Sequence, residues 1–265
     1  MPQFPRLLLA VSPGSTLPQL PASVELAHMA YRIGPRCRLL RTRPELDLNG
    51  GFLMISGAAS SCLGDLERFC LQVLSECRIH HAIGVIANWE LHPQCVPLAT
   101  RLDHTLAQVG LEFWVPEYYA ESAAGAKVFI SSQISGGSLT ACLQEALSRW
   151  GSRTTLAIEC TPWMFQLPCA SGRGTPLNEE QLRQLMADRA PRFWFSESLC
   201  SQYFTYQEEN QLCLVLFENA ASVRKKLALA ARLGLDGAVL SWDEVTPFAR
   251  ELFYPTPKQS GRARF

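Results

Sequence analysis

The stretch SVRKKLALAARLGLDGAVLSW, residues 222–242, contains a helix and then a strand. Apolar residues repeat at helical spacing over 222–233, and the basic residues 224–226 form the opposite face. Gly234 is the residue type that most often ends a helix, because glycine adopts a positive φ without strain. The apolar run at 238–240 is typical of a parallel strand covered on both faces. One helix–strand unit of this kind indicates an α/β protein.

The same alternation of strand-like and helix-like segments extends along the whole chain. Eight strands in such an alternation predict one (β/α)8 barrel domain over residues 1–265. Two connections, 43–51 and 117–126, are shorter than a parallel crossover with a helix normally needs. Either two helices are vestigial or one strand is wrongly assigned. The predicted strands are Arg6–Ser12, Cys37–Thr42, Phe52–Ser56, Ile83–Trp89, Leu111–Pro116, Lys127–Ser132, Thr154–Cys160 and Ala238–Trp242.

The segment from about 166 to 219 is longer than one barrel crossover requires. A helix is predicted over Asn178–Arg189, with two glutamates in its first turn. The aromatic and apolar runs at 193–195, 203–206 and 212–217 are typical of short strands. The sequence therefore predicts an irregular barrel with a small β insertion before the last helix–strand unit.

Composition excludes several classes of function. The 265 residues carry 24 basic and 24 acidic side chains, so no net charge would draw the protein to nucleic acid or to an anionic membrane. No apolar stretch is long enough to span a bilayer, and the N-terminal apolar run is too short for a secretory signal. The ten cysteines contain no Cys-x-x-Cys pair that would favour a zinc site. We therefore predict a cytoplasmic protein with ten free thiols.

Carboxylates, amides and aromatic residues collect where the predicted strands end, which is where barrels carry their function. Carboxylates that protonate an ether oxygen, and flat rings that stack on sugars, are features of glycoside chemistry. No histidine cluster, Gly-x-Ser-x-Gly elbow or Walker loop accompanies them. The candidates are Asn88, Glu90, Glu117, Tyr118, Gln133, Glu159, Trp163 and Trp242.

The order of these segments resembles family 18 of the glycoside hydrolases, the chitinase-like barrels. The run Ile83–Glu90 matches the family's strand-four motif, Asp-Gly-x-Asp-x-Asp-x-Glu, at its glutamate. Glu218–Lys226 and Gly237–Trp242 follow the family's last helix and strand. The resemblance implies a barrel that binds N-acetylhexosamine-containing glycans, with Glu90 as proton donor and without a metal or cofactor. Soluble chito-oligosaccharides or peptidoglycan fragments suit a cytoplasmic protein better than bulk chitin.

The departure from the family motif concerns catalysis directly. Asn88 stands where the family has an aspartate that orients the substrate acetamide. Strand alternation predicts that Ile86, Asn88 and Glu90 share the face toward the barrel interior. The neutral Asn88 would weaken the site by about 1 kcal/mol or more. Ile86 and Trp89 are expected to desolvate the Glu90 carboxyl, which favours its protonated form.

The other candidates each have two interpretations. Trp242 either stacks on sugar or belongs to the core, and Glu117 and Glu159 either bind sugar hydroxyls or form structural ion pairs. Gln133 stands about where the family has a tyrosine that holds the acetamide. Two other functions stay open. One is a sugar-binding pseudoenzyme of the same fold. The other is a barrel enzyme for phosphorylated metabolites, based on the segment 135–138 before a helix, where Ser138 is otherwise a plain N-cap.

Overall fold

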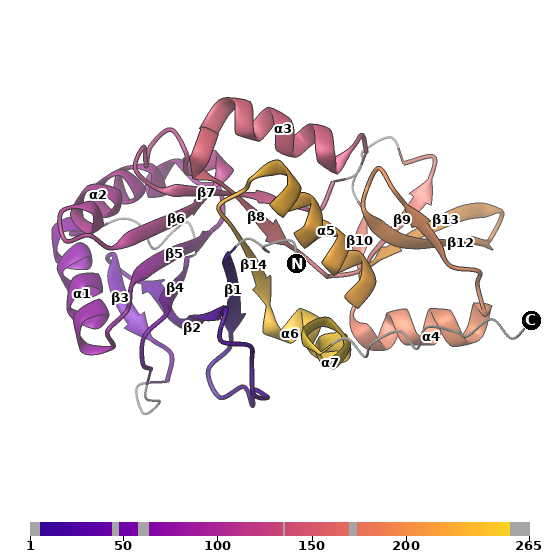
Figure 1. The fold of residues 1–265 in the computed structure, drawn as a ribbon, viewed down its shortest axis with the longest axis horizontal. Coiled ribbons are helices and arrows are strands. Elements are labelled where there is room, and N and C mark those ends of the chain that lie inside the picture. The colour runs from indigo at the N-terminus through magenta and orange to yellow at the C-terminus, as the bar shows by residue number, and fades with distance from the viewer. Residues whose placement is uncertain (1–5, 44–47, 58–63, 135, 170–173, 255–265) are drawn as a thin grey trace, which may run out of the picture.

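Eight parallel strands close into a barrel in the computed structural model, which describes residues 6–43, 48–57, 64–134, 136–169 and 174–254 (Figure 1). The ring closes because β1 pairs with β14 on one side and with β2 on the other. The (β/α)8 prediction is therefore confirmed. The barrel strands are β1 (Arg6–Val11), β2 (Val24–Gly34), β4 (Phe52–Gly57), β5 (Gly84–Trp89), β6 (Glu112–Pro116), β7 (Lys127–Ser131), β8 (Thr154–Ile158) and β14 (Gly237–Ser241).

One predicted strand is wrong. The second barrel strand is β2, and the predicted segment Cys37–Thr42 is instead β3 (Arg38–Arg41), which folds back antiparallel on β2 outside the barrel. The sequence Val24–Gly34 hides its strand character, because Glu25, His28 and Arg32 interrupt the apolar residues. The short apolar run of β3 gave the stronger local signal, although its burial is only partial.

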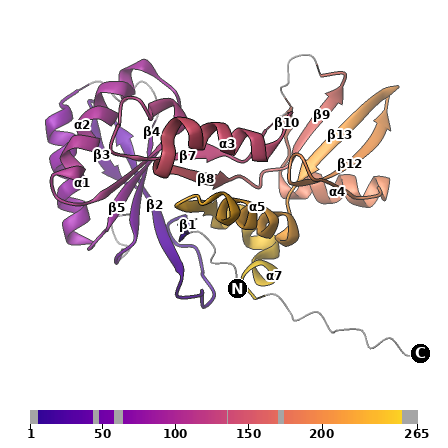
Figure 2. The same ribbon diagram turned by 45° about the horizontal axis from the view of Figure 1, so that its top comes forward.

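Helices cover the barrel unevenly. Helices α1 (Leu66–Ile79), α2 (Val96–Ala107), α3 (Leu139–Trp150) and α5 (Ala220–Leu233) pack around the outside (Figures 1 and 2). The connection from β6 to β7 holds only a 3-10 turn, Glu117–Tyr119, and residues 12–23 between β1 and β2 contain no helix. The short connection between β6 and β7 thus reflects a missing helix, whereas the one before Phe52 reflects the wrongly assigned strand.

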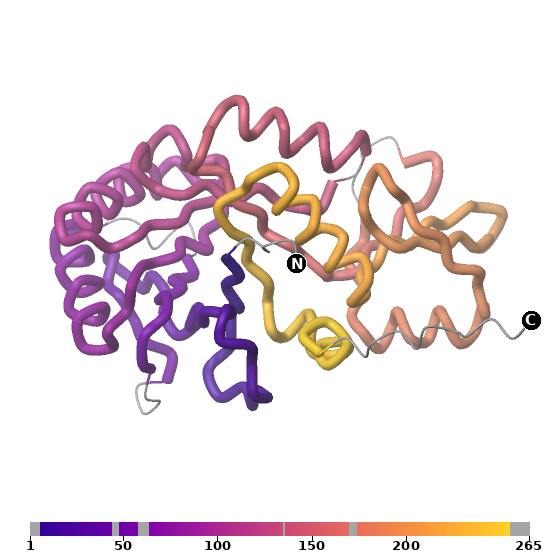
Figure 3. The backbone as a smooth tube through the Cα atoms, in the orientation of Figure 1, coloured from indigo at the N-terminus to yellow at the C-terminus, as the bar shows by residue number. Residues whose placement is uncertain are grey.

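An antiparallel sheet of five strands lies between β8 and α5 in sequence. Its order is β10-β9-β13-β12-β11, and it packs on α4 (Glu179–Arg189) through Phe204, Val215 and Leu182. Figure 3 shows the chain leaving the barrel after β8 and returning through α5. The predicted helix and strands of the insertion are confirmed, and two strands were missed. The bounds are β9 (Trp163–Leu167), β10 (Thr175–Pro176), β11 (Trp194–Ser196), β12 (Ser201–Glu208) and β13 (Gln211–Phe217).

Strand alternation divides the barrel core into an inner and an outer layer. The inner layer fills the barrel, and the outer layer packs against the helices. Ile86 belongs to the inner layer, whereas Val85, Ala87 and Trp89 of the same strand belong to the outer one. The inner layer comprises Leu8, Ala10, Ala27, Phe52, Met54, Ile86, Trp114, Ala157 and Val239.

The prediction that all ten thiols are free is wrong. Cys95, at the start of α2, is disulfide-bonded. The described cysteines outside a disulfide bond are Cys37, Cys70, Cys77, Cys142, Cys160, Cys169, Cys200 and Cys213, and Cys62 lies outside the described residues. Within the described ranges, each helix is too short or too polar to cross a lipid bilayer.

Candidate active site

The end of β5 opens into a groove of about 720 Å³ at the mouth of the barrel. Asn88 and Glu90 both line it, and both are exposed, with Ile86 buried one layer below. This is the placement that strand alternation predicts. We call this cavity the β5 groove; the residues around it are Arg32, Ile33, Gly34, Pro35, Leu40, Ser56, Gly57, Asn88, Trp89, Glu90 and Tyr118.

The prediction that Ile86 and Trp89 shield the Glu90 carboxyl from water is wrong, because Glu90 is exposed. Trp89 turns to the outer layer, where it is 2% exposed, so its ring does not cover the neighbouring carboxyl. Among the described residues, no arginine or lysine forms an ion pair with Glu90. The carboxyl is therefore available to a ligand in the groove.

Two tyrosines from the end of β6 hold the backbone on both sides of Glu90. Tyr118 donates its hydroxyl hydrogen bond to the carbonyl of Trp89. Tyr119, fully buried, donates to the carbonyl of Glu90 over 2.7 Å and accepts from the amide of His92 over 3.1 Å. Burial raises the pKa of Tyr118 to about 12, and the nearby Tyr119 and the carboxylates Glu90 and Glu159 add to the shift. Tyr118 is thus a neutral hydrogen-bond donor at neutral pH.

Changing Tyr119 to phenylalanine should loosen this support. The variant leaves the carbonyl of Glu90 and the amide of His92 without their buried partner, so we expect a loss of about 1–3 kcal/mol in the free energy of unfolding. Urea denaturation measures this loss. Tyr118→Phe is the control, because the Tyr118 side chain is 45% exposed and water can replace its hydrogen bond. Equal losses in both variants would contradict the role given to Tyr119.

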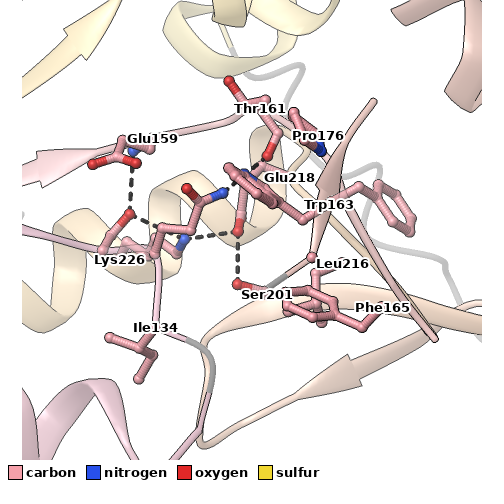
Figure 4. A pocket seen from close by; sticks show the side chains of 14 residues that line it. Ile134, Glu159, Thr161, Trp163, Phe165, Pro176, Ser201, Leu216, Glu218 and Lys226 are labelled. Atoms are coloured by element: carbon pink, nitrogen blue, oxygen red, sulfur yellow. Dashed lines mark hydrogen bonds and ion pairs between the residues drawn. The ribbon is translucent and has the colours of Figure 1, made fainter. Parts of the chain in front are cut away.

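A second cavity, of about 490 Å³, lies between the ends of β7 and β8 and the antiparallel sheet (Figure 4). Three predicted site residues line it: Gln133, Glu159 and Trp163. The amide of Gln133 donates to the carbonyl of Thr161 over 3.1 Å. Burial raises the pKa of Glu159, and the carboxylate of Glu244 adds to the shift. We call this cavity the insertion pocket.

A buried ion pair forms one wall of the insertion pocket. The ammonium of Lys226 lies 2.7 Å from the carboxylate of Glu218, and these side chains are only 1% and 6% exposed. Ser201 donates to the same carboxylate over 2.6 Å, and Lys226 also donates to Ser132 over 3.3 Å (Figure 4). These contacts join β12, α5 and the segment after β7, so they tie the antiparallel sheet to the barrel.

The remaining candidates lie away from both cavities. Trp242 is 8% exposed and packs in the outer layer with Leu240, because the inner face of β14 belongs to Val239. This corresponds to the core interpretation and not to a sugar-stacking floor. Glu117 is exposed and accepts a hydrogen bond from the Trp150 indole over 3.2 Å, outside the barrel. Trp242, Tyr118 and Glu159 therefore do not line one common cavity.

The segment predicted to bind phosphate is only partly described, because Ser135 lies outside the described residues. Ser138 precedes α3 without a capping hydrogen bond from its side chain, and the first helical amide, that of Leu139, donates to the carbonyl of Ser198. In the adjacent insertion pocket, Glu218 already pairs with Lys226, the one basic side chain among the described lining residues, so the pocket offers a phosphate no unpaired cation there. Among the described residues, no group of three histidine, cysteine or acidic side chains is placed to hold a metal.

Sequence reasoning missed Arg32 and the roles of Glu218 and Lys226. Arg32 was hidden because its strand was not recognised. The pair Glu218 and Lys226 was visible only as part of a family-like pattern, and nothing in the spacing showed that both side chains are buried. Lys226 lies in α5, whose N-cap Asn219 forms a capping box with Ser222, and Glu218 directly precedes this cap.

Comparison with solved structures places this architecture among known proteins. The spore cortex-lytic enzyme SleL of Bacillus cereus superposes with a TM-score of 0.67 over 94% of this chain and 72% of its own, at 15% sequence identity. A chitinase of Chromobacterium violaceum gives 0.64 over 91% and 98%, at 14% identity. The fold is that of the chitinase-like barrels.

A further similar structure contains a bound ligand. The class V chitinase of Nicotiana tobaccum, as a variant in complex with NAG4, superposes with a TM-score of 0.58 over 82% of this chain and 86% of its own, at 12% identity. Neither a family model nor a curated protein sequence matches this chain. The resemblance seen in the sequence is thus confirmed at the level of the fold.

Proposed function

We propose that this chitinase-like barrel binds N-acetylhexosamine-containing glycans in the β5 groove and hydrolyses them with Glu90 as proton donor. The observation that carries the proposal is the joint presence of Asn88 and Glu90 in one open groove at the end of the fourth barrel strand. Active sites of such barrels lie at this end of the strands. The tobacco chitinase in complex with NAG4 supports the substrate class.

The proposed reaction uses the substrate's own acetamide. The acetamide oxygen attacks the anomeric carbon and forms a bond to it, while the bond from that carbon to the leaving oxygen breaks. Glu90 gives its proton to the leaving oxygen, and water then opens the cyclic intermediate and returns a proton to the Glu90 carboxylate. Asn88 accepts a hydrogen bond from the acetamide N–H and so orients it. This step differs from the family pattern, because Asn88 carries no charge to balance the positive intermediate.

The neutral Asn88 also favours a second candidate function, a binding protein with slow turnover. Without a carboxylate at this position, the groove retains its hydrogen-bonding side chains but stabilises the charged transition state less. The insertion pocket, with Gln133, Glu159 and Trp163, offers further contacts to a bound oligosaccharide in either case.

Changing Asn88 to aspartate should separate the two functions. The new carboxylate would stabilise the positive charge next to the acetamide, so we expect kcat to rise about tenfold or more with little change in binding. Hydrolysis of a fluorogenic N-acetylglucosamine trimer measures the rate, and calorimetry with the unlabelled trimer measures binding. Binding without turnover in both proteins would favour the binding protein, and no binding in either would exclude this substrate class.

The location of the protein stays a prediction. We predicted the cytoplasm, and the disulfide at Cys95 is an observation against it, because disulfides persist mainly in oxidising compartments. The glycan remains the proposed ligand in either compartment.

A further inference from the structure

An arginine lies in the β5 groove on the same row of residues as Asn88. Arg32 of β2 is in register with Ser56 of β4, which is in register with Asn88 of β5. Side chains in register on neighbouring strands of a parallel sheet point to the same side, and neighbouring strands lie about 4.8 Å apart. Arg32 and Asn88 are therefore separated by only two strand spacings, and both line the groove.

The charge of Arg32 is not neutralised by a described residue. Arg32 is exposed, and its side chain forms neither a hydrogen bond nor an ion pair within the described ranges. Two more exposed arginines, Arg36 and Arg38, follow on the hairpin of β2 and β3, but they do not line the groove. Among the described residues around the groove, Arg32 is the basic one.

This charge is out of place for a neutral sugar chain. A planar guanidinium binds carboxylates through two parallel hydrogen bonds, and it gains little from hydroxyl groups that water serves equally well. An oligomer of N-acetylglucosamine alone carries no anionic group that Arg32 would recognise. A sugar that bears an ether-linked carboxylic acid carries such a group beside its ring.

We propose that the β5 groove selects N-acetylhexosamine oligomers that carry a carboxylate, and that Arg32 binds this carboxylate. The inference rests on the proposed function, because it assumes that Asn88 and Glu90 receive the sugar to be cleaved. Arg32 then contacts a substituent of the sugar chain two strands away and sets specificity without taking part in proton transfer.

The test compares two oligomers of equal length, one of N-acetylglucosamine alone and one that alternates N-acetylglucosamine with N-acetylmuramic acid. We expect the wild-type protein to favour the acidic oligomer in kcat/KM and in calorimetric affinity. Arg32→Gln should lose about 10- to 100-fold with the acidic oligomer and little with the neutral one, as expected for a hydrogen bond to a charged group. Arg32→Lys should fall between, and salt should reduce the preference.

Arg38→Gln is the matched control, because Arg38 is exposed on the same hairpin but does not line the groove. Equal use of both oligomers by the wild type would overturn the inference and leave the proposed function intact. Equal losses with both oligomers in Arg32→Gln would mean that Arg32 supports Glu90 and does not bind the substrate carboxylate. This result would also overturn the inference. If neither oligomer binds, the proposed function itself fails and the inference fails with it.

Discussion

Glu90→Gln should lower the rate of glycan hydrolysis by about 10²- to 10⁴-fold, the usual contribution of a general acid. Glutamine fills the same space but has no proton of suitable acidity to give to the leaving oxygen. Because the side chain is exposed and forms no ion pair with another described residue, the substitution should leave the fold unchanged. A fluorogenic N-acetylglucosamine trimer measures kcat, and calorimetry should show that the trimer still binds.

Glu117→Gln is the control for this prediction. Glu117 also follows a barrel strand, but it faces Trp150 outside the barrel and lines neither cavity. The Glu117→Gln variant should hydrolyse the trimer at a rate within a factor of about two of the wild type. Substitutions away from functional contacts usually change free energies by less than about 0.5 kcal/mol. Full activity of Glu90→Gln would remove Glu90 from the mechanism.

Lys226→Met should destabilise the protein by about 3–5 kcal/mol, the cost of removing one partner from a buried ion pair. Methionine has about the length of lysine, so the loss would come from charge and not from a cavity. The carboxylate of Glu218 would keep only its hydrogen bond from Ser201, because its other oxygen has no partner among the described residues. The midpoint of urea denaturation measures the effect.

The adjacent residue supplies the matched control. Lys225 pairs with Glu197 over 3.0 Å on the surface, where the two side chains are 51% and 82% exposed. Lys225→Met should therefore cost less than about 1 kcal/mol. A double variant, Lys226→Met with Glu218→Leu, should recover part of the loss, because no buried charge remains. Equal effects of Lys225→Met and Lys226→Met would contradict the structural role of the buried pair.

The barrel could be predicted from its sequence because most of its strands are buried on both faces. Continuous apolar runs such as Phe52–Ile55 and Ala238–Leu240 identify such strands without knowledge of their neighbours. β2 was not predicted because both of its ends carry polar residues. Its C-terminal end lines the β5 groove, and near its N-terminal end Glu25 accepts hydrogen bonds from Arg6. A strand that contributes polar residues to a site loses the signal by which strands are found.

The site could be predicted where a single strand determines it. Alternation along β5 was enough to bring Asn88 and Glu90 to the groove. It was not enough for Trp242, because the last residue of β14 is Ser241 and the helical turn that follows sends Trp242 into the outer layer. Alternation along single strands also could not predict that Tyr118 and Glu159 line two different cavities, because each cavity is lined by residues from several elements.

Among the described strands, β3 pairs with β2 alone, so the hairpin gives this closed barrel a sheet edge, a feature that closed barrels otherwise lack. An unpaired edge strand can pair with a strand of another molecule, and three properties of β3 oppose such pairing. β3 has only four residues, it begins and ends with arginine, and its Leu39 amide donates to the Gln72 side chain of α1 over 3.1 Å. The hairpin can thus place Arg32 beside the groove without exposing a strand edge that favours aggregation.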